Sequence, residues 1–386
     1  MRVVERLGSE RGAVFVQVGI AIFVLAAFNV FVLDYGMMWM ARRQAQNAAD
    51  AGALAGATAR GYDDFDDPPS SGGIVPQIAS SVAASNLVWR QPGTSVVSFD
   101  CPAGVTGRCV RVDVYRDGAA GSTPLPTVFG PLLGVTSQGA RATATAVSAN
   151  GNGTNCLRPF AFADGWTERQ GNNQFNGYDA AGNPLVNRDL YSTPGTTLSD
   201  DFGQRINFNL NSNPLVDPIT TGMLVPLDFG GGTVPDYQSS IEGCSGQPHA
   251  IGDVIPLMPA PGALGGTNTT AVTNVIAQDS LATWNAFVNK VENSCAPGCA
   301  SVSPRLIPVA LFDPDQYQRR LVLNDWTACP GGAPCVTVSN ILGLFIHIGV
   351  APNPHGHMVR YPGLTVTSAP TYDDNGSWLT TTTLIR

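Results

Sequence analysis

The chain has 386 residues, a formal net charge of −8 and charged side chains at only 13% of positions. This length exceeds one typical domain, so we expect a membrane helix together with one or two globular parts. The acidic balance and the lack of basic patches argue against nucleic acid as a partner, because phosphate binding needs clustered Lys and Arg. Glycine, proline, asparagine and threonine are plentiful, which indicates loop-rich β structure.

The first predicted element is a continuous helix over residues 12–59. Between Arg11 and Asp34 no side chain is charged, and only Gln17 and Asn29 interrupt the apolar run. A helix of that length covers roughly 30 Å, the hydrocarbon thickness of a bilayer. We predict one retained membrane span rather than a cleaved signal peptide, whose apolar core usually has about 7 to 15 residues.

Beyond the span, the same helix is expected to continue as an alanine-rich segment. No proline or glycine pair stops it before Ala59, and Trp39 lies at the expected membrane exit, where its ring suits the interface. Small residues then recur three or four positions apart, which allows another backbone to approach closely. We predict that this stripe packs against partner helices. Its residues are Ala45, Ala49, Gly52, Ala53 and Gly56.

Residues 61–150 are predicted to form a small α+β head. The segment 61–73 begins it as a polar break, whose aspartates we interpret as a solvated linker because EF-hand spacing is missing. Apolar residues at helical spacing predict an amphipathic helix over 74–90. Apolar and polar residues alternate in three later stretches, which predicts antiparallel strands. These stretches are 95–100, 109–116 and 139–148.

A composition rich in Asn, Gly and Pro starts at Asn150 and marks a domain boundary. Residues 151–386 are expected to form a mainly-β domain with many loops. Residues 278–293 are the exception, because their apolar side chains recur on one helical face. Further strands are predicted at 305–312, 336–350 and 378–385. The second of these runs is too short and too polar to be another membrane span.

Eight cysteines occur as neighbouring pairs, several of them in tight loops. An even number in such loops indicates disulfides in an oxidising compartment, so the bulk of the chain is expected outside the cytoplasm. The preferred pairing is Cys101 with Cys109, Cys156 with Cys244, Cys295 with Cys299, and Cys329 with Cys335. Zinc binding by the last four is the alternative, which their spacing and the lack of a nearby histidine disfavour.

No catalytic constellation is recognisable, so an enzyme is not predicted. The sequence has no GxSxG elbow, no HExxH, no GxxxxGK and no dinucleotide fingerprint. His355 and His357 would share one side of a strand, but two histidines make a weak metal site and a turn at Pro354 explains the sequence equally well. His347 is interpreted as a packed core residue. We therefore predict no catalytic residue, metal ligand or cofactor.

The order of the N-terminal features resembles a known family. The segment RGAV, an apolar span, Asp34 at its exit and then ARRQAQNAADAGALAGA together resemble the TadE/TadG-like proteins of the Flp, or tight-adherence, pilus assembly system. These motifs cover about the first sixty residues. Three later segments resemble larger TadG-type members: CLRPFAFADGW near residue 156, LDFGGG before Cys244, and SPRLIPVALFDP near residue 303.

The predicted elements make an α+β chain with a long helix, a small sheet head and a disulfide-stapled C-terminal domain, and the resemblance also implies that the helix and head are pilin-like. It also implies a single-pass anchor in the bacterial inner membrane, with the bulk of the chain in the periplasm. The partners would be inner-membrane lipid and Tad/Flp pilins or pilus-machine membrane subunits. The expected function is a non-catalytic component of pilus assembly, either a minor pseudopilin-like protein or an assembly factor.

One position departs from the family's pattern. Tad pseudopilins that a prepilin peptidase cleaves carry glycine followed five positions later by glutamate, and counting from Gly12 this chain has Gln17 instead. We expect the chain to be uncleaved, because glutamine lacks the charge that would pair with a neighbouring subunit's amino terminus.

Two other functions stay open from the sequence. One is a membrane-anchored extracytoplasmic binding module or adhesin, in which Asn- and Asp-rich loops at 172–183 and 372–377 would coordinate calcium. Turn formation explains these loops more simply. The other is a periplasmic hydrolase whose motif is not recognised.

Overall fold

The computed structural model describes residues 10–62, 69–70, 72–105, 107–193, 195–300, 302–348, 354–366 and 378–385. Two sequence features lie outside these residues. They are the aspartates of the predicted linker at 63–67 and the candidate calcium loop at 372–377.

Contacts divide the chain into two compact units. Unit 1 is Met1–Ser148 with Thr382–Arg386, and unit 2 is Ala149–Thr381. In this division the long helix belongs with the small head, and residues 382–386 return to the same unit. The three predicted segments stay a prediction. The chain is α+β, as predicted.

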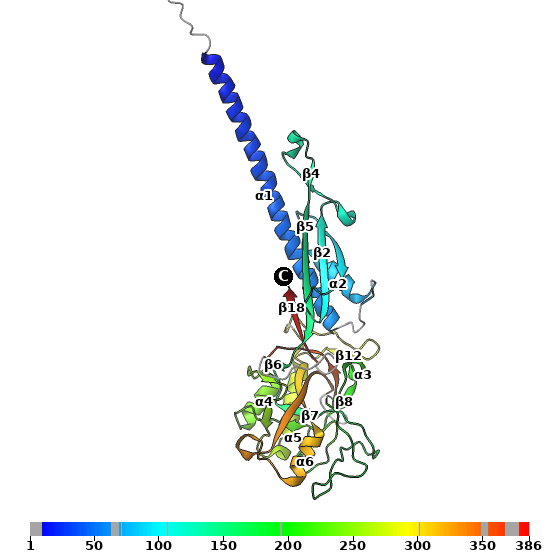
Figure 1. The fold of residues 1–386 in the computed structure, drawn as a ribbon. Helices are drawn as coiled ribbons and strands as arrows, with labels where there is room; N and C mark the ends of the chain where they lie inside the picture. The colour runs from blue at the N-terminus through cyan, green and yellow to red at the C-terminus, as the bar shows by residue number, and fades with distance from the viewer. Residues whose placement is uncertain are drawn as a thin grey trace, which may run out of the picture. The chain divides into compact units, whose positions relative to one another are not determined.

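The first helix, α1 (Glu10–Tyr62), is uninterrupted over 53 residues. The prediction of a helix that continues beyond the apolar span is therefore confirmed. At about 1.5 Å per residue it is about 80 Å long. Within the described part of the chain, α1 is the one helix long and apolar enough to cross a membrane. Figure 1 shows its N-terminal half extending beyond the other elements of unit 1.

The rest of unit 1 is a second helix and an antiparallel sheet, as the sequence predicted. These elements are α2 (Ile74–Ser85), β1 (Thr94–Ser98), β2 (Arg108–Arg116), β5 (Ala140–Asn150) and the C-terminal part of β18 (Leu379–Ile385). The valines of β2 lie opposite alanines of β5, with Val110 opposite Ala146 and Val112 opposite Ala144. These valines and alanines share one buried core with the second half of α1.

Short elements link β2 to β5 in unit 1. They are η1 (Ala119–Gly121), β3 (Leu125–Pro126), η2 (Gly130–Leu133) and β4 (Ser137–Gln138). Strands β3 and β4 form a small antiparallel pair, and η2 lies in the loop between them.

Unit 2 is built around a mixed sheet of seven strands. In spatial order they are β8 (Arg205–Asn207), β16 (His355–Val359), β15 (Cys335–Ile348), β14 (Leu306–Phe312), β7 (Phe160–Ala163) and β9 (Val225–Pro226), with β11 (Val254–Pro256) also paired to β15. Strands β7 and β14 are parallel, and β14, β15 and β16 are antiparallel neighbours. The strands predicted within 305–312, 336–350 and 378–385 are confirmed.

Helices lie against both faces of this sheet. They are α4 (Val234–Glu242), α5 (Gly265–Ala277) and α6 (Pro314–Leu323). A further short helix of unit 2 is α3 (Leu198–Asp201). Along β14, Val309 and Leu311 lie in one core with α4 and α5, whereas Phe312 lies in the other core with Tyr317 of α6. Because both faces are covered, β15 is a buried strand, as the sequence predicted.

Smaller elements complete unit 2. They are β6 (Gly153–Thr154), β10 (His249–Ala250), η3 (Pro261–Ala263), β12 (Thr283–Asn285), β13 (Lys290–Glu292), η4 (Pro330–Gly332) and β17 (Tyr361–Pro362).

The helix predicted over 278–293 was wrong, because this segment forms the β12–β13 hairpin. Of its apolar side chains, Trp284 is buried, but Leu281 and Phe287 are 73% and 99% exposed. The side chain of Asn285 accepts a hydrogen bond from the backbone N–H of Phe287, which fixes the turn. Local turn chemistry therefore prevailed over an apparent helical period.

The actual helix of this region, α5, was missed. Its sequence is rich in threonine and asparagine, which are weak helix formers. It is stabilised by burial of Ala271, Val272 and Val275 against the sheet. A helix of this kind owes its stability to tertiary packing rather than to its own propensity.

All four predicted disulfides are present. They join Cys101 to Cys109, Cys156 to Cys244, Cys295 to Cys299, and Cys329 to Cys335. The zinc alternative for the last four cysteines is therefore excluded in this oxidised state. Cys156 and Cys244 are 88 positions apart, a larger separation than in the other three bridges. If disulfides stabilise by lowering the entropy of the unfolded chain, this bridge contributes the most of the four.

Candidate membrane and partner interface

The N-terminal half of α1 presents apolar side chains that none of the described residues of unit 1 covers. Phe15 and Phe23 are 81% and 70% exposed. The amide of Asn29 donates a hydrogen bond to the carbonyl oxygen of Leu25 at 3.0 Å, so this polar group is satisfied within the helix. An exposed apolar helix with an internally satisfied backbone is the arrangement that a bilayer requires.

The small-residue stripe of α1 lies in the core of unit 1. Its members are the five residues predicted to pack against partner helices, Ala45, Ala49, Gly52, Ala53 and Gly56. All three alanines are fully buried, and α2 and β2 of the same chain supply the covering side chains. Contact with a partner helix stays a prediction, whereas packing within the chain already accounts for the small residues.

The two glycines of the stripe lie at its closest contacts. A Cβ atom at Gly52 would lie 2.8 Å from the carbonyl oxygen of Ala79, and one at Gly56 would lie 2.8 Å from Cγ1 of Val110. Any side chain at these positions must displace α2 or β2. The glycines therefore set the distance between α1 and the rest of the head.

Asp34, the aspartate at the end of the apolar span, binds a backbone loop of unit 1. Its two carboxylate oxygens accept hydrogen bonds from the backbone N–H groups of Val128, Phe129 and Gly130, at distances from 2.7 to 3.4 Å. This loop precedes η2 and carries the exposed side chain of Val128. Asp34 thus fastens the β3–β4 loop to α1 where the apolar span ends.

Replacing Asp34 with asparagine is expected to loosen this loop without unfolding the sheet. The asparagine amide has no negative charge, and its NH₂ group would face the backbone N–H donors. The charge-assisted hydrogen bonds of the carboxylate are lost, which should cost about 1–3 kcal/mol. Hydrogen exchange at residues 128–130 should accelerate about tenfold or more. Asp117→Asn is the control, because the Asp117 carboxylate accepts a hydrogen bond from the N–H of Ala119 within its own turn. Unchanged exchange at 128–130 would contradict the assignment.

Beside the stripe, α1 and β5 border a polar groove of about 460 Å³. It is lined by Arg43, Gln46, Asn47, Asp50, Thr143, Ala144 and Ile385. The Gln46 amide donates to the Asp50 carboxylate at 2.8 Å and to the carbonyl oxygen of Thr143 at 3.2 Å. The polar face of α1 after the span is therefore partly bonded to its own sheet.

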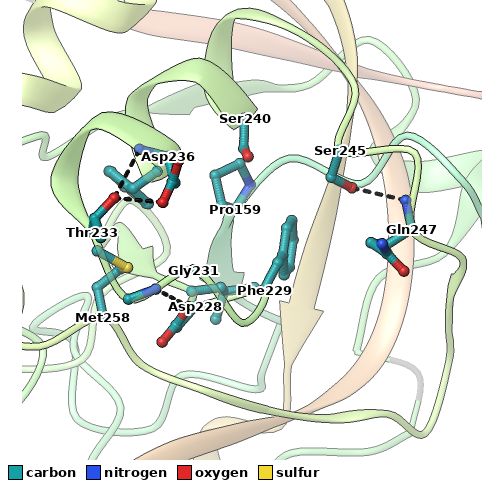
Figure 2. Close-up of a pocket in the computed structure, with 13 residues that line it drawn as sticks. Pro159, Asp228, Phe229, Gly231, Thr233, Asp236, Ser240, Ser245, Gln247 and Met258 are labelled. Carbon is teal, nitrogen blue, oxygen red and sulfur yellow. Dashed lines mark hydrogen bonds between the residues drawn. The ribbon is translucent and has the colours of Figure 1, made fainter.

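Unit 2 has a separate pocket of about 210 Å³ at the start of α4 (Figure 2). The LDFGGG segment forms one wall, and Asp228 accepts hydrogen bonds from the N–H groups of Gly230 and Gly232. Thr233 caps α4 by accepting a bond from the N–H of Asp236. These polar groups are used within the loop itself, so a structural role explains LDFGGG.

Three of the four histidines meet in unit 2, which the sequence did not predict. His355 and His357 lie on β16 and His347 on β15. Burial, together with the neighbouring His355 and His357, lowers the pKa of His347 to about 4, and burial lowers the pKa of His357. The sequence does contain a sign of this cluster. Two apolar strands that follow one another along the chain often pair as a hairpin, and this pairing would bring His347 close to His355 and His357.

Together these features define a chain with one helix long and apolar enough to cross a membrane, and this helix continues into an α+β head. Residues 12–59 match a family described as putative Flp pilus-assembly TadE/G-like, and this segment lies within α1. The resemblance seen in the N-terminal motifs is thereby confirmed, and the segment connects the chain with Flp pilus assembly. Searches of curated proteins and of solved structures found no match for the chain.

Proposed function

We propose that this protein is a non-catalytic, single-pass component of Tad/Flp pilus assembly, of the larger TadG type. It is either a minor pseudopilin-like subunit or an assembly factor. The observation that carries the proposal is that the Tad-matching segment is one helix with two surfaces, an exposed apolar half and a half packed on its own head.

The exposed half is the part available to partners. Side chains such as Phe15 and Phe23 are free to contact lipid or the membrane helices of pilins and pilus-machine subunits. The buried stripe contributes by holding the head at a fixed place on the helix. We therefore place partner docking on the uncovered apolar surface of α1, and contact of a partner with its alanines and glycines stays a prediction.

The disulfides support a location in the oxidising periplasm for everything after the span. Four bridges are distributed over both units, from Cys101 to Cys335. Stable disulfides are rare in the bacterial cytoplasm and common in the periplasm. The anchor would then lie in the inner membrane, as in an uncleaved TadG-like protein.

Photocrosslinking in native membranes tests the docking surface. A benzophenone analogue of phenylalanine at Phe23 should capture Tad/Flp pilins or membrane subunits of the pilus machine. The same analogue at Phe287 is the matched control, since Phe287 is 99% exposed but lies in unit 2. A probe at Ala49 is unsuitable because this residue is fully buried. If Phe23 captures only lipid, the helix is an anchor alone and the docking proposal fails.

A further inference from the structure

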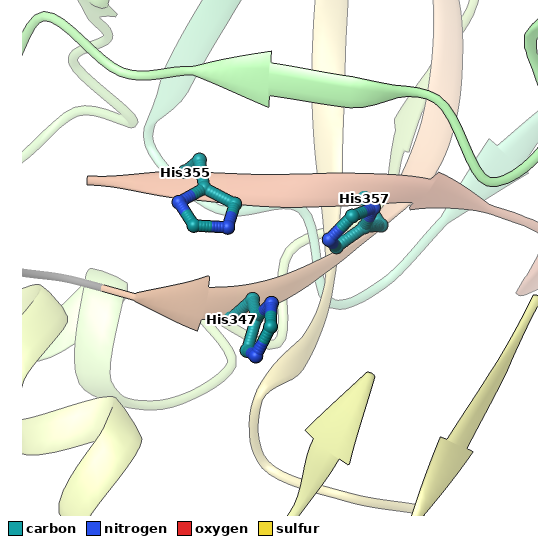
Figure 3. A group of neighbouring side chains, drawn as sticks. All are labelled: His347, His355 and His357. Atoms are coloured by element: carbon teal, nitrogen blue, oxygen red, sulfur yellow. The ribbon is translucent and has the colours of Figure 1, made fainter. Parts of the chain in front are cut away.

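Three imidazole rings converge on the β15–β16 pair of unit 2 (Figure 3). His355 and His357 alternate along β16, and His347 comes from β15. Their ring centres are 5.1, 5.5 and 5.7 Å apart. Their potential ligand atoms all lie within 4.8 Å of one another. The three side chains therefore offer nitrogen ligands to one point.

A β-bulge brings His347 into this group. Ile346 pairs with Gly356, but the next pair joins Ile348 to His355. The residue between them on β15, His347, is therefore the extra residue of the bulge. Bulges redirect side chains and are frequent beside functional sites.

The ring spacing fits a tetrahedral metal ion. With metal–nitrogen bonds of about 2.0–2.1 Å, two imidazole nitrogens lie about 3.4 Å apart and their ring centres about 5 Å apart. The observed ring centres are 5.1 to 5.7 Å apart. Small side-chain rotations that move the nitrogen atoms by about 1 Å would give the spacing of a tetrahedral metal site.

Contacts outside the trio hold His357 in a ligating orientation. Its Nδ1 lies 3.0 Å from the carbonyl oxygen of Gly203, so Nδ1–H donates this bond and Nε2 remains as the ligand atom. Its ring stacks on Trp284 with centres 4.6 Å apart and planes 9° apart. A second hydrogen bond and a packed ring are the usual supports of metal-binding histidines.

His347 has a buried nitrogen that the rest of the described chain does not satisfy. Its Nδ1 is inaccessible and has no hydrogen-bond partner among the described residues. The position of its backbone is fixed by Arg305, which donates to the carbonyl oxygen of His347 at 2.6 Å. Buried polar atoms without a partner are rare in folded proteins, and a metal ion would satisfy this group of rings.

Neighbouring charges restrict the kind of ion. Arg205 and Arg305 contribute positive charge near the rings, although Arg205 binds Asn207 and Arg305 binds backbone carbonyls. Positive neighbours favour neutral imidazoles, which are the ligating form, but raise the cost of a cation. The ion must therefore form strong bonds to nitrogen, unlike calcium or magnesium, which prefer oxygen ligands.

We propose that His347, His355 and His357 bind one zinc-type divalent transition-metal ion. Three neutral imidazoles match the ligand set of open zinc sites, in which a fourth position holds water or another ligand. The cysteines do not compete for the metal, since all eight are in disulfides. The site goes beyond the pilus-assembly role and does not depend on it.

The test is metal binding by the full-length protein, purified in detergent, freed of any polyhistidine tag and stripped with chelator. Equilibrium dialysis against zinc should give one ion per chain. Cobalt in place of zinc should give the intense visible bands of a tetrahedral site. His347→Gln and His355→Gln should each weaken zinc binding about 100-fold or more. Loss of a residue that only hydrogen-bonds to a metal ligand already lowers metal affinity about 10–100-fold.

His249→Gln is the matched control, because this fourth histidine packs on Phe229 outside the cluster. It should keep wild-type zinc affinity. Circular dichroism of the metal-free variants checks their fold, and the cobalt spectrum of the wild-type protein decides the question if a variant fails to fold. The proposal is overturned if wild-type protein binds no zinc at micromolar concentrations. Equal weakening by His249→Gln would also overturn it.

Discussion

Replacing Gly56 with leucine is expected to destabilise unit 1 strongly while the N-terminal half of α1 still enters the membrane. A Cβ atom at this position would lie 2.8 Å from Val110 and 2.9 Å from Cβ of Ala79. Both neighbours belong to fully buried residues, so neither can move aside cheaply. Leucine adds three more carbons, and we expect a loss of about 3 kcal/mol or more.

Thermal unfolding of the full-length protein in detergent measures this effect. A loss of that size should lower the melting temperature of unit 1 by about 10 °C, and hydrogen exchange should locate the change in β2 and β5. Gly36→Leu is the matched control, because a Cβ there meets nothing within 4 Å on the same helix. Equal melting temperatures for the two variants would contradict the packing argument.

The same pair of variants also tests the stripe as a partner surface. If Gly56→Leu leaves the head folded but prevents pilus assembly, the glycine contacts a partner as the sequence predicted. If assembly fails only together with folding of the head, intramolecular packing is sufficient. Membrane insertion should be normal in both variants, since the apolar run between Arg11 and Asp34 is unchanged.

Sequence reasoning succeeded where the signal is local. The long helix follows from a run without helix breakers, and cysteines in short loops such as Cys295 and Cys299 can hardly reach other partners. The alternation of valines in β2 likewise determines which face is buried. Each of these features depends on residues close together in the chain.

The features that were missed depend on tertiary contacts. The small residues of the stripe indicate close packing, but a sequence does not say whether the covering element is a partner helix or part of the same chain. In this structure α2 and β2 cover the stripe, and contact with a partner helix stays a prediction. The hairpin of β12 and β13 mimicked a helical period through Leu281 and Phe287, which are exposed. The histidine cluster depends on a bulge in β15, and no local sequence pattern predicts this bulge.

Loss of the Arg305 side chain should strongly destabilise unit 2. Its guanidinium donates to four backbone carbonyls, those of Asp279, Ala282, Ile346 and His347, at distances from 2.6 to 3.1 Å. It also lies over the ring of Phe345. The residue is only 3% exposed, so no water can replace these donors without opening the core.

Arg305→Met should therefore destabilise unit 2 by about 3–5 kcal/mol, because buried carbonyls lose their donors and the charge near Asp279 is removed. Arg305→Lys should recover only part of this, since an ammonium has three donors and cannot reproduce the planar fork. Thermal unfolding should show a fall of about 10 °C for Arg305→Met. Arg169→Met, at an exposed position, is the control. A melting temperature for Arg305→Met close to that of the control would show that the carbonyl network of Arg305 does not stabilise the fold.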